Sequence, residues 1–271
     1  MGVAIVLFGV LVIALILGIP VAAAIGTATL VSFIYVDLPL AAMAQRMYAS
    51  VDSFTLLAIP FFMFAGALME SGGMSRRLVR FANSIVGTLA GGLAHVQVLA
   101  SCFFAALSGS SPATTAAIGS ALIPEMKREG YPPEFAAAVQ SVSGTVGTII
   151  PPSIPMVVYG VVANQSIGKL FIAGFLPGLI YGLCLMVVVY IISKKRGYIS
   201  ASTTEFSLKE VWNSFKDAIW ALLVPIVILG GIYFGIFTPT EAGAVAAVYG
   251  LLAGIFIYKE LDGKKIVDIL A

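Results

Sequence analysis

Seven long stretches of the chain contain no aspartate, glutamate, lysine or arginine, and together they hold 195 of its 271 residues. A helix of about 20 apolar residues crosses the hydrocarbon core of a bilayer. The stretches show no period-two alternation of the kind that strands carry, so helices are favoured. The pattern predicts an all-α polytopic membrane protein. The uncharged stretches are residues 1–36, 53–69, 81–124, 135–168, 170–193, 218–240 and 242–258.

Proline and charge divide these stretches into individual helices. Proline can begin a helix but cannot continue one, so Pro20 splits the first stretch in two. The segments 38–52 and 207–217 are amphipathic. Three arginines on an otherwise apolar segment at 75–86 are typical of a helix among lipid headgroups, and a charged connector is the alternative. The predicted spans are 3–18, 20–36, 53–69, 170–193, 218–236 and 240–258.

The longest stretch, 81–124, is interrupted by Ser108-Gly109-Ser110-Ser111-Pro112. The arm that follows, 112–123, has 12 residues and a helical length of about 18 Å, whereas the hydrocarbon core is about 30 Å thick. This arm is too short to cross. We therefore predict a re-entrant hairpin with its polar tip at membrane depth, where irregular backbone must be buried in protein or face a watery cavity.

The next crossing, residues 135–163, is also interrupted. Three prolines fall within Ile150-Pro151-Pro152-Ser153-Ile154-Pro155, and each removes a backbone donor and frees a carbonyl that a helix would otherwise bond. This segment is predicted to be a broken helix. The charged segment 125–133, between the hairpin and this helix, is expected to be a loop that returns to water.

The distribution of charge supports a hairpin that returns to its starting side. With such a hairpin, 13 of the 15 lysines and arginines share one face of the membrane, and only Arg46 and Lys169 lie opposite. Basic loops concentrate on the cytoplasmic side, so the N-terminus is expected outside. The net charge of +2 is too small to indicate a nucleic-acid partner, and both cysteines lie in apolar stretches, which excludes a disulfide scaffold or zinc site.

A weak repeat relates the two ends of the chain. Residues 18–23 align with 237–242, and the predicted topology gives the copies opposite orientations, as in the inverted repeats of secondary transporters; chance proline placement is the alternative. The second repeat is expected to be incomplete. The expected regions are N-terminal scaffold spans with an interfacial helix (1–87), a transport region with the hairpin and broken helix (88–165), a span with a cytoplasmic amphipathic connector (166–217), and the truncated start of the second repeat (218–271).

Two clusters of small polar residues are expected to meet inside the membrane, at the hairpin tip and at 143–153. Unwound backbone leaves carbonyl oxygens without helical partners, and such oxygens, together with hydroxyls, bind a hard cation such as Na⁺. The helices that restart near Pro112 and Pro155 direct free N–H groups to the same place, which favours an anion. One site would then bind cation and anion together. The alternative is that these small residues only allow close helix packing.

Three motifs, LSGSSPAT at Leu107–Thr114, GTIIPPSIP at Gly147–Pro155 and FTPTEA at Phe237–Ala242, resemble those of the large permease subunit of TRAP (tripartite ATP-independent periplasmic) transporters, the DctM-like family. The resemblance runs over the whole chain. It implies an elevator-type importer in the bacterial inner membrane that couples uptake of an organic acid anion, a C4-dicarboxylate or a sialic-acid-like sugar acid, to sodium. The implied partners are a small membrane subunit and a periplasmic substrate-binding protein.

The resemblance also implies which residues bind the transported species. The family's first sodium site corresponds here to Ser108, Ser111, Gly147, Ile150 and Pro152, mostly through carbonyls. The candidate substrate contacts are Ser110, Thr114 and Ser153. The family's second hairpin and second sodium site have no counterpart in this sequence. No organic cofactor is expected.

Other functions fit parts of the pattern. A stand-alone sodium/dicarboxylate symporter would need no binding protein. An intramembrane serine protease would use Ser110 or Ser111 with His95 as base, but about 20 Å of helix separates them and the typical Gly-x-Ser-Gly setting is missing. A passive channel would need a ring of charge or an uninterrupted polar face. The chain is therefore predicted not to be an enzyme.

Glu241 and His95 are titratable residues next to or within apolar stretches. Glu241 could carry an ion in the membrane, but Thr238-Pro239-Thr240-Glu241 is also a capping box with proline at the first helical position, and we favour the cap. His95 could relay protons, but a packed histidine bonded to a neighbouring helix is the favoured interpretation.

Overall fold

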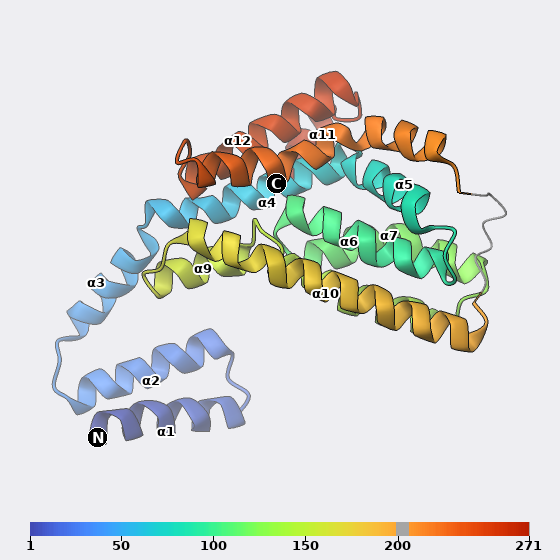
Figure 1. The fold of residues 1–271 in the computed structure, drawn as a ribbon. Helices are drawn as coiled ribbons and strands as arrows, with labels where there is room; N and C mark the ends of the chain where they lie inside the picture. Colours follow the sequence, from blue (N-terminus) through green and yellow to red (C-terminus); the bar gives the residue numbers. More distant parts are fainter. Residues whose placement is uncertain (199–205, 271) are drawn as a thin grey trace. The chain divides into compact units, whose positions relative to one another are not determined.

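The computed structural model describes residues 1–198 and 206–270, and every regular element within them is a helix (Figure 1). The all-α prediction is therefore confirmed for this part of the chain. The chain divides into two compact units, Met1–Ser53 and Phe54–Ala271.

The first unit is a helical hairpin followed by an amphipathic helix. The turn between the first two helices contains Gly18, whose φ of +77° is rare for residues with a side chain. The hairpin buries small side chains such as Ala24 and Ala28, while its large apolar side chains are mostly exposed. Small residues at the contact and apolar residues outside are typical of helices packed in lipid. The helices are α1 (Gly2–Ile16), α2 (Val21–Tyr35) and α3 (Leu40–Val51).

The second unit contains the remaining helices. Four segments among the described residues, beginning at Phe54, Ile167, Leu208 and Pro239, are long and apolar enough to cross a membrane. The elements are η1 (Phe54–Leu57), α4 (Ala58–Ser71), α5 (Met74–Val86), α6 (Gly92–Ser108), α7 (Ser111–Arg128), α8 (Pro133–Gly144), η2 (Thr145–Thr148), α9 (Ile154–Val162), α10 (Ile167–Arg196), α11 (Leu208–Tyr233), α12 (Pro239–Leu252), η3 (Ala253–Ile257) and α13 (Gly263–Leu270).

α4 and α12 pack along their whole length on small residues. A Cβ on Gly250 would lie 3.1 Å from Cγ of Met69, and one on Gly243 would lie 3.0 Å from Cβ of Phe61. Glycine at these two positions therefore lets the backbones approach closely, as in other membrane helix pairs. At one end, the Thr240 hydroxyl donates to the Phe54 carbonyl at 3.1 Å.

α6 and α7 form the predicted hairpin, but its second arm is longer than expected. α7 has 18 residues, contains Pro124 and continues to Arg128, so the first part of the segment predicted as a loop at 125–133 is helical. At 1.5 Å per residue the arm measures about 27 Å, and the argument from a short arm was wrong. The helix continues because Met126 is fully buried in a cluster with Leu93 and Val98. Leu93 and Met126 are at the open end of the hairpin, so α7 returns to the level where α6 begins.

α11 also differs from the prediction. The amphipathic segment predicted at 207–217 and the span predicted at 218–236 are one continuous helix, which runs from Leu208 to Tyr233. Its polar first turns are held against α5, because Arg80 forms ion pairs with Glu210 at 2.9 Å and with Asp217 at 3.0 Å. These contacts raise the pKa of the Arg80 guanidinium, through its hydrogen bond to Glu210 first.

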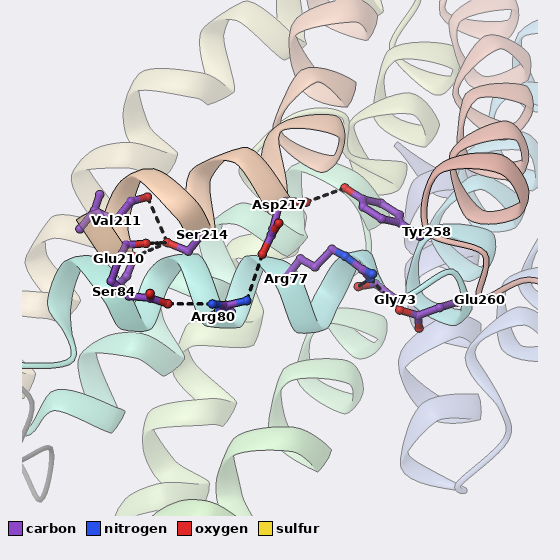
Figure 2. A network of polar contacts seen from close by, with 10 residues as sticks. All are labelled: Gly73, Arg77, Arg80, Ser84, Glu210, Val211, Ser214, Asp217, Tyr258 and Glu260. Atoms are coloured by element: carbon purple, nitrogen blue, oxygen red, sulfur yellow. Dashed lines mark hydrogen bonds and ion pairs between the residues drawn. The ribbon is translucent and has the colours of Figure 1, made fainter. Parts of the chain in front are cut away.

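Arg77 of α5 binds the segment that follows α12 (Figure 2), and Arg76 contacts the same segment. Arg77 donates to the Glu260 carboxylate at 2.7 Å and lies over the Tyr258 ring at 3.9 Å, and Arg76 also pairs with Glu260. Tyr258 in turn donates to the Asp217 carbonyl at 3.0 Å. The predicted headgroup arginines are thus engaged with carboxylates of the protein, and they connect α5 to both α11 and the end of α12.

The charge of Glu260 supports a test of this network. Desolvation opposes ionisation of Glu260, but the hydrogen bond and charge of Arg77, with those of Arg76, outweigh it and lower the pKa of the carboxyl. A lowered pKa means that the carboxylate stabilises the fold fully at neutral pH and loses this effect as the pH falls through the lowered value. We expect Glu260→Gln to lower the free energy of unfolding in detergent by about 1 kcal/mol at pH 7.

The matched control is Glu125→Gln, because Glu125 has no ion pair among the described residues. Thermal unfolding of both variants at pH 7 and at about pH 4, near the ordinary pKa of a glutamate, measures the effect. The difference between Glu260→Gln and the unaltered chain should shrink at the lower pH. Equal unfolding of the two variants at pH 7 would contradict the stabilising role of the network.

Candidate functional site

The hairpin tip is a short non-helical link whose hydroxyls bond one another. Gly109 has a φ of +61°, and Ser110 is extended before α7 begins. The Thr114 hydroxyl donates to the Ser110 carbonyl at 2.8 Å and lies 3.0 Å from the Ser108 hydroxyl. Ser110 caps α7 by accepting from the Ala113 amide at 3.4 Å. Ser108 and Thr114 are both buried, so the tip holds its polar groups inside the protein.

The predicted broken helix is confirmed, and its break is longer than the proline cluster. α8 ends at Gly144, η2 continues as a 3₁₀ turn to Thr148, and helix resumes only at Ile154. Within the break, the Ser153 hydroxyl donates to the Thr148 carbonyl at 2.8 Å. Pro152 has no amide hydrogen with which to form the helical bond to the Thr148 carbonyl, and the Ser153 hydroxyl bonds this carbonyl instead.

The two breaks are in direct contact, as predicted. The Ile154 amide donates to the Gly109 carbonyl at 3.0 Å. A Cβ on Gly109 would lie 2.6 Å from the Pro152 carbonyl oxygen, and one on Gly147 would lie 2.7 Å from the Ser110 carbonyl oxygen. Only glycine allows such an approach of backbone to backbone at these positions. The hairpin tip and the break therefore form one polar centre.

The candidate residues occupy different parts of this centre. Ser111 is the half-buried first residue of α7, and its amide nitrogen lies 2.8 Å from the position of a Gly147 Cβ. The Ile150 side chain packs with Ala105 and Val146, so this residue offers only its backbone. The structure gathers the others around the contact between the two breaks, namely Ser108, Ser110, Thr114, Gly147, Pro152 and Ser153.

Several residues that support the centre were not predicted. Gln140 donates to the Thr114 carbonyl at 3.3 Å and to Ser101 at 3.5 Å. Gly66 of α4 faces Ser108, because a Cβ there would lie 3.1 Å from the Ser108 Cα. Gly174 and Gly178 of α10 face the break, beside Ile149 and Ile150. Two features of the sequence could have indicated these residues. One is the small-xxx-small spacing of Gly174 and Gly178, which is typical of closely packed membrane helices. The other is a polar residue, Gln140, inside an apolar span.

The chemistry of the centre suits a hard monovalent cation. Its donors are carbonyl and hydroxyl oxygens. The described residues contain no group of three or more histidines, cysteines or acidic residues that could hold a metal ion. Transition metals prefer imidazole and thiolate ligands, whereas oxygen ligands suit hard cations. α7 and α9 both begin at this centre, and the positive ends of their helix dipoles favour an anion there, although the Ala113 and Ile154 amides already bond Ser110 and Gly109.

Two other predictions are resolved here. Glu241 is part of a capping box, since the Thr238 amide donates to its carboxylate at 2.8 Å and its own amide donates to the Thr238 hydroxyl at 3.3 Å. His95 is buried, lies 3.1 Å from the Gly91 carbonyl, bonds the Met186 backbone of α10 and packs its ring against Tyr190, so the packed histidine bonded to a neighbouring helix is confirmed. Because α6 separates His95 from Ser110 by about 20 Å, a serine–histidine pair is not formed.

Comparison with known proteins places these features in a family context. A family model described as "Tripartite ATP-independent periplasmic transporter, DctM component" matches residues 5–271. The chain is 49% identical over 258 residues to the isethionate TRAP transporter permease protein DctMQ of Oleidesulfovibrio alaskensis. The aligned part is 95% of this chain and 40% of that protein.

Two further relatives have different names. The chain is 51% identical over 219 residues to the C4-dicarboxylate TRAP transporter large permease protein DctM of Pseudomonas aeruginosa, covering 81% of this chain and 51% of that protein. It is 41% identical over 251 residues to the sialic acid TRAP transporter permease protein SiaT of Haemophilus influenzae. The aligned part is 92% of this chain and 40% of that protein. The chain spans about half the length of the curated relatives it matches.

The close contact at Gly147 gives a test of the polar centre. Gly147→Ala places a methyl group against the Ser110 backbone, so we expect the free energy of unfolding to fall by about 1–3 kcal/mol, as for other overpacked sites. Gly230→Ala in α11 is the matched control, because a Cβ there has no described atom within 4 Å. Thermal unfolding of the two variants in detergent makes the measurement. If both variants unfold alike, the two breaks are not in the close contact described.

Proposed function

The chain belongs to the DctM family of tripartite ATP-independent periplasmic transporter components, and from this premise we propose that it is part of the large membrane subunit of a sodium-coupled importer of organic acid anions. The observation that carries the proposal is the contact between the hairpin tip and the broken helix. This contact brings backbone carbonyls and hydroxyls from both segments together at one buried place. A secondary transporter needs such a place for its coupling ion.

Sodium is proposed to bind through backbone carbonyls around the contact, with hydroxyls from the hairpin tip. Its ligands would come from Ser108, Ser111, Gly147, Ile150 and Pro152. These donors are neutral, so a single positive charge is bound without a carboxylate to neutralise it. Neutral oxygens hold a monovalent cation less strongly than carboxylates would, and a transported ion must also be released.

The substrate is proposed to be an organic acid anion that binds beside the sodium. The relatives' names refer to isethionate, C4-dicarboxylates and sialic acid, which all carry an acid group. The N-termini of α7 and α9 would direct the positive ends of their helix dipoles toward this group. Ser110, Thr114 and Ser153 are the proposed contacts. Ser110 is only partly buried, whereas Thr114 and Ser153 lie inside the protein.

The transport step is proposed to be an elevator movement of the hairpin and the broken helix together. Two of the surfaces that would slide are lined by glycine, at Gly66 of α4 and at Gly174 and Gly178 of α10. Surfaces without side chains allow one packed body to shift past another with little interlocking. The proposed location is the bacterial inner membrane with the N-terminus in the periplasm. The proposed partners are a small membrane subunit and a periplasmic substrate-binding protein.

Removing one hydroxyl from the tip tests the sodium site. We expect Ser108→Ala to raise the sodium concentration for half-maximal uptake about tenfold, which corresponds to a loss of about 1.4 kcal/mol of binding free energy. The measurement is substrate uptake by proteoliposomes that contain the complete transporter and its binding protein, over a sodium titration. Ser120→Ala is the matched control, since Ser120 is an exposed serine on α7 that bonds only its own helix.

Membrane insertion of both variants is checked by their yield after purification. Superimposable sodium titrations for Ser108→Ala and the unaltered transporter would refute the assignment of Ser108 to the sodium site. Uptake that does not depend on sodium at all would refute the coupling itself.

A further inference from the structure

Two glutamine side chains inside the second unit have polar atoms without partners. Gln97 of α6 is fully buried, and neither its amide nitrogen nor its amide oxygen has a hydrogen-bond partner among the described residues. Gln140 of α8 is 1% exposed, and its amide oxygen also has none. Val96 and Val98, the neighbours of Gln97, are fully buried apolar residues. An amide in such surroundings costs free energy unless something bonds it.

These amides belong to a polar stripe along one face of α6. Gln97 and Ser101 are four residues apart, and Ser108 lies seven residues further, so the three side chains point to the same side of the helix. Gln140 reaches this stripe from α8 and connects Ser101 to the Thr114 carbonyl of α7. All of these residues are at least nine-tenths buried. The stripe is about 16 Å long by the rise of a helix.

The direction of the stripe relates it to the polar centre. It begins at Ser108 in the hairpin tip and runs inside the hairpin toward the end where Leu93 and Met126 meet. That end leads to the basic residues Lys127 and Arg128. The stripe therefore extends from the contact between the two breaks toward the face that carries the basic clusters, and it ends at Gln97, next to the buried apolar cluster that contains Leu93 and Met126.

We propose that this stripe is a buried water-binding site, and that its waters form a hydrated path by which the cation leaves the tip toward the basic face. Water is the ligand whose bonding fits, because one molecule donates two hydrogen bonds and accepts two. Buried waters typically bond about three polar groups that the protein leaves unsatisfied. Both ends of the Gln97 amide and the free Gln140 oxygen are such groups. The part of this proposal that concerns the cation rests on the proposed function.

Silver ions test whether the stripe is hydrated. Ag⁺ is a small monovalent cation that reacts with thiols, and it reaches a buried thiol only along a path that water or a cation can follow. In a version of the assembled permease whose native cysteines, including Cys102 and Cys184, are replaced, Ser101→Cys is compared with Ala100→Cys. Ser101 and Ala100 are adjacent and both fully buried, but Ala100 lies in the apolar core.

We expect the Ser101→Cys thiol to react with Ag⁺ at least ten times faster than the Ala100→Cys thiol. The reaction is followed in membrane vesicles by quenching at set times, denaturing the protein and labelling the remaining free thiols with a fluorescent maleimide. This readout does not require uptake. Equal rates for the two thiols, fast or slow, would overturn the hydrated stripe.

A second pair of variants tests the role in transport. We expect Gln97→Leu to lower the maximal uptake rate at least threefold and to leave the half-saturating sodium concentration unchanged, whereas Gln165→Leu, at an exposed glutamine beyond α9, leaves both unchanged. Unaltered uptake together with a higher unfolding temperature for Gln97→Leu would show a dry, unpaired amide and overturn the proposal. If Ser108→Ala leaves the sodium titration unchanged while Ser101→Cys reacts rapidly, the sodium site fails and the hydrated stripe stands.

Discussion

A backbone hydrogen bond between two interrupted helices organises the central part of this protein. Inside a membrane, every peptide group that leaves a helix must find another partner, since lipid offers none. Here the Gly109 carbonyl, freed at the hairpin tip, accepts from the Ile154 amide, which is freed at the restart of the broken helix. Each break thus provides a hydrogen-bond partner for a backbone group that the other break leaves without a helical one. Neither would be stable alone at the same depth, and this mutual dependence makes the pair one structural unit.

The side chains around this hydrogen bond follow from it. Gly109 and Gly147 are glycines because backbone lies where their Cβ atoms would be. Ser108, Thr114 and Ser153 bond neighbouring hydroxyls or carbonyls and hold the unwound segments in shape. The carbonyls of Gly109, Ser110 and Pro152 lie at this contact, which is why we propose the sodium site there. Support from Gln140 extends this polarity along the inside of the hairpin.

A different kind of interaction holds the helices around this unit. α4 and α12 approach closely through glycines, and the arginines of α5 connect α11 to the segment after α12. The ion pairs lie at one end of these helices, where partly exposed charges can be solvated. The helices are therefore stabilised by close apolar packing along their length and by ion pairs at their ends. This division matches the environment, since an ion pair inside the hydrocarbon would carry a large desolvation cost.

The sequence alone determined which segments are helical and apolar and where two of them break. Uncharged length, proline and glycine act locally, so they predicted the hairpin at Ser108–Pro112, the break near Pro151 and the cap at Glu241. Only the tertiary structure decided how far α7 continues past Pro124, that α11 is one helix, and that Gln97 and Gln140 lie unpaired on a shared stripe. These features depend on contacts between residues far apart in the chain. Local propensity carries no information about such partners, because burial and hydrogen bonding are properties of the packed state.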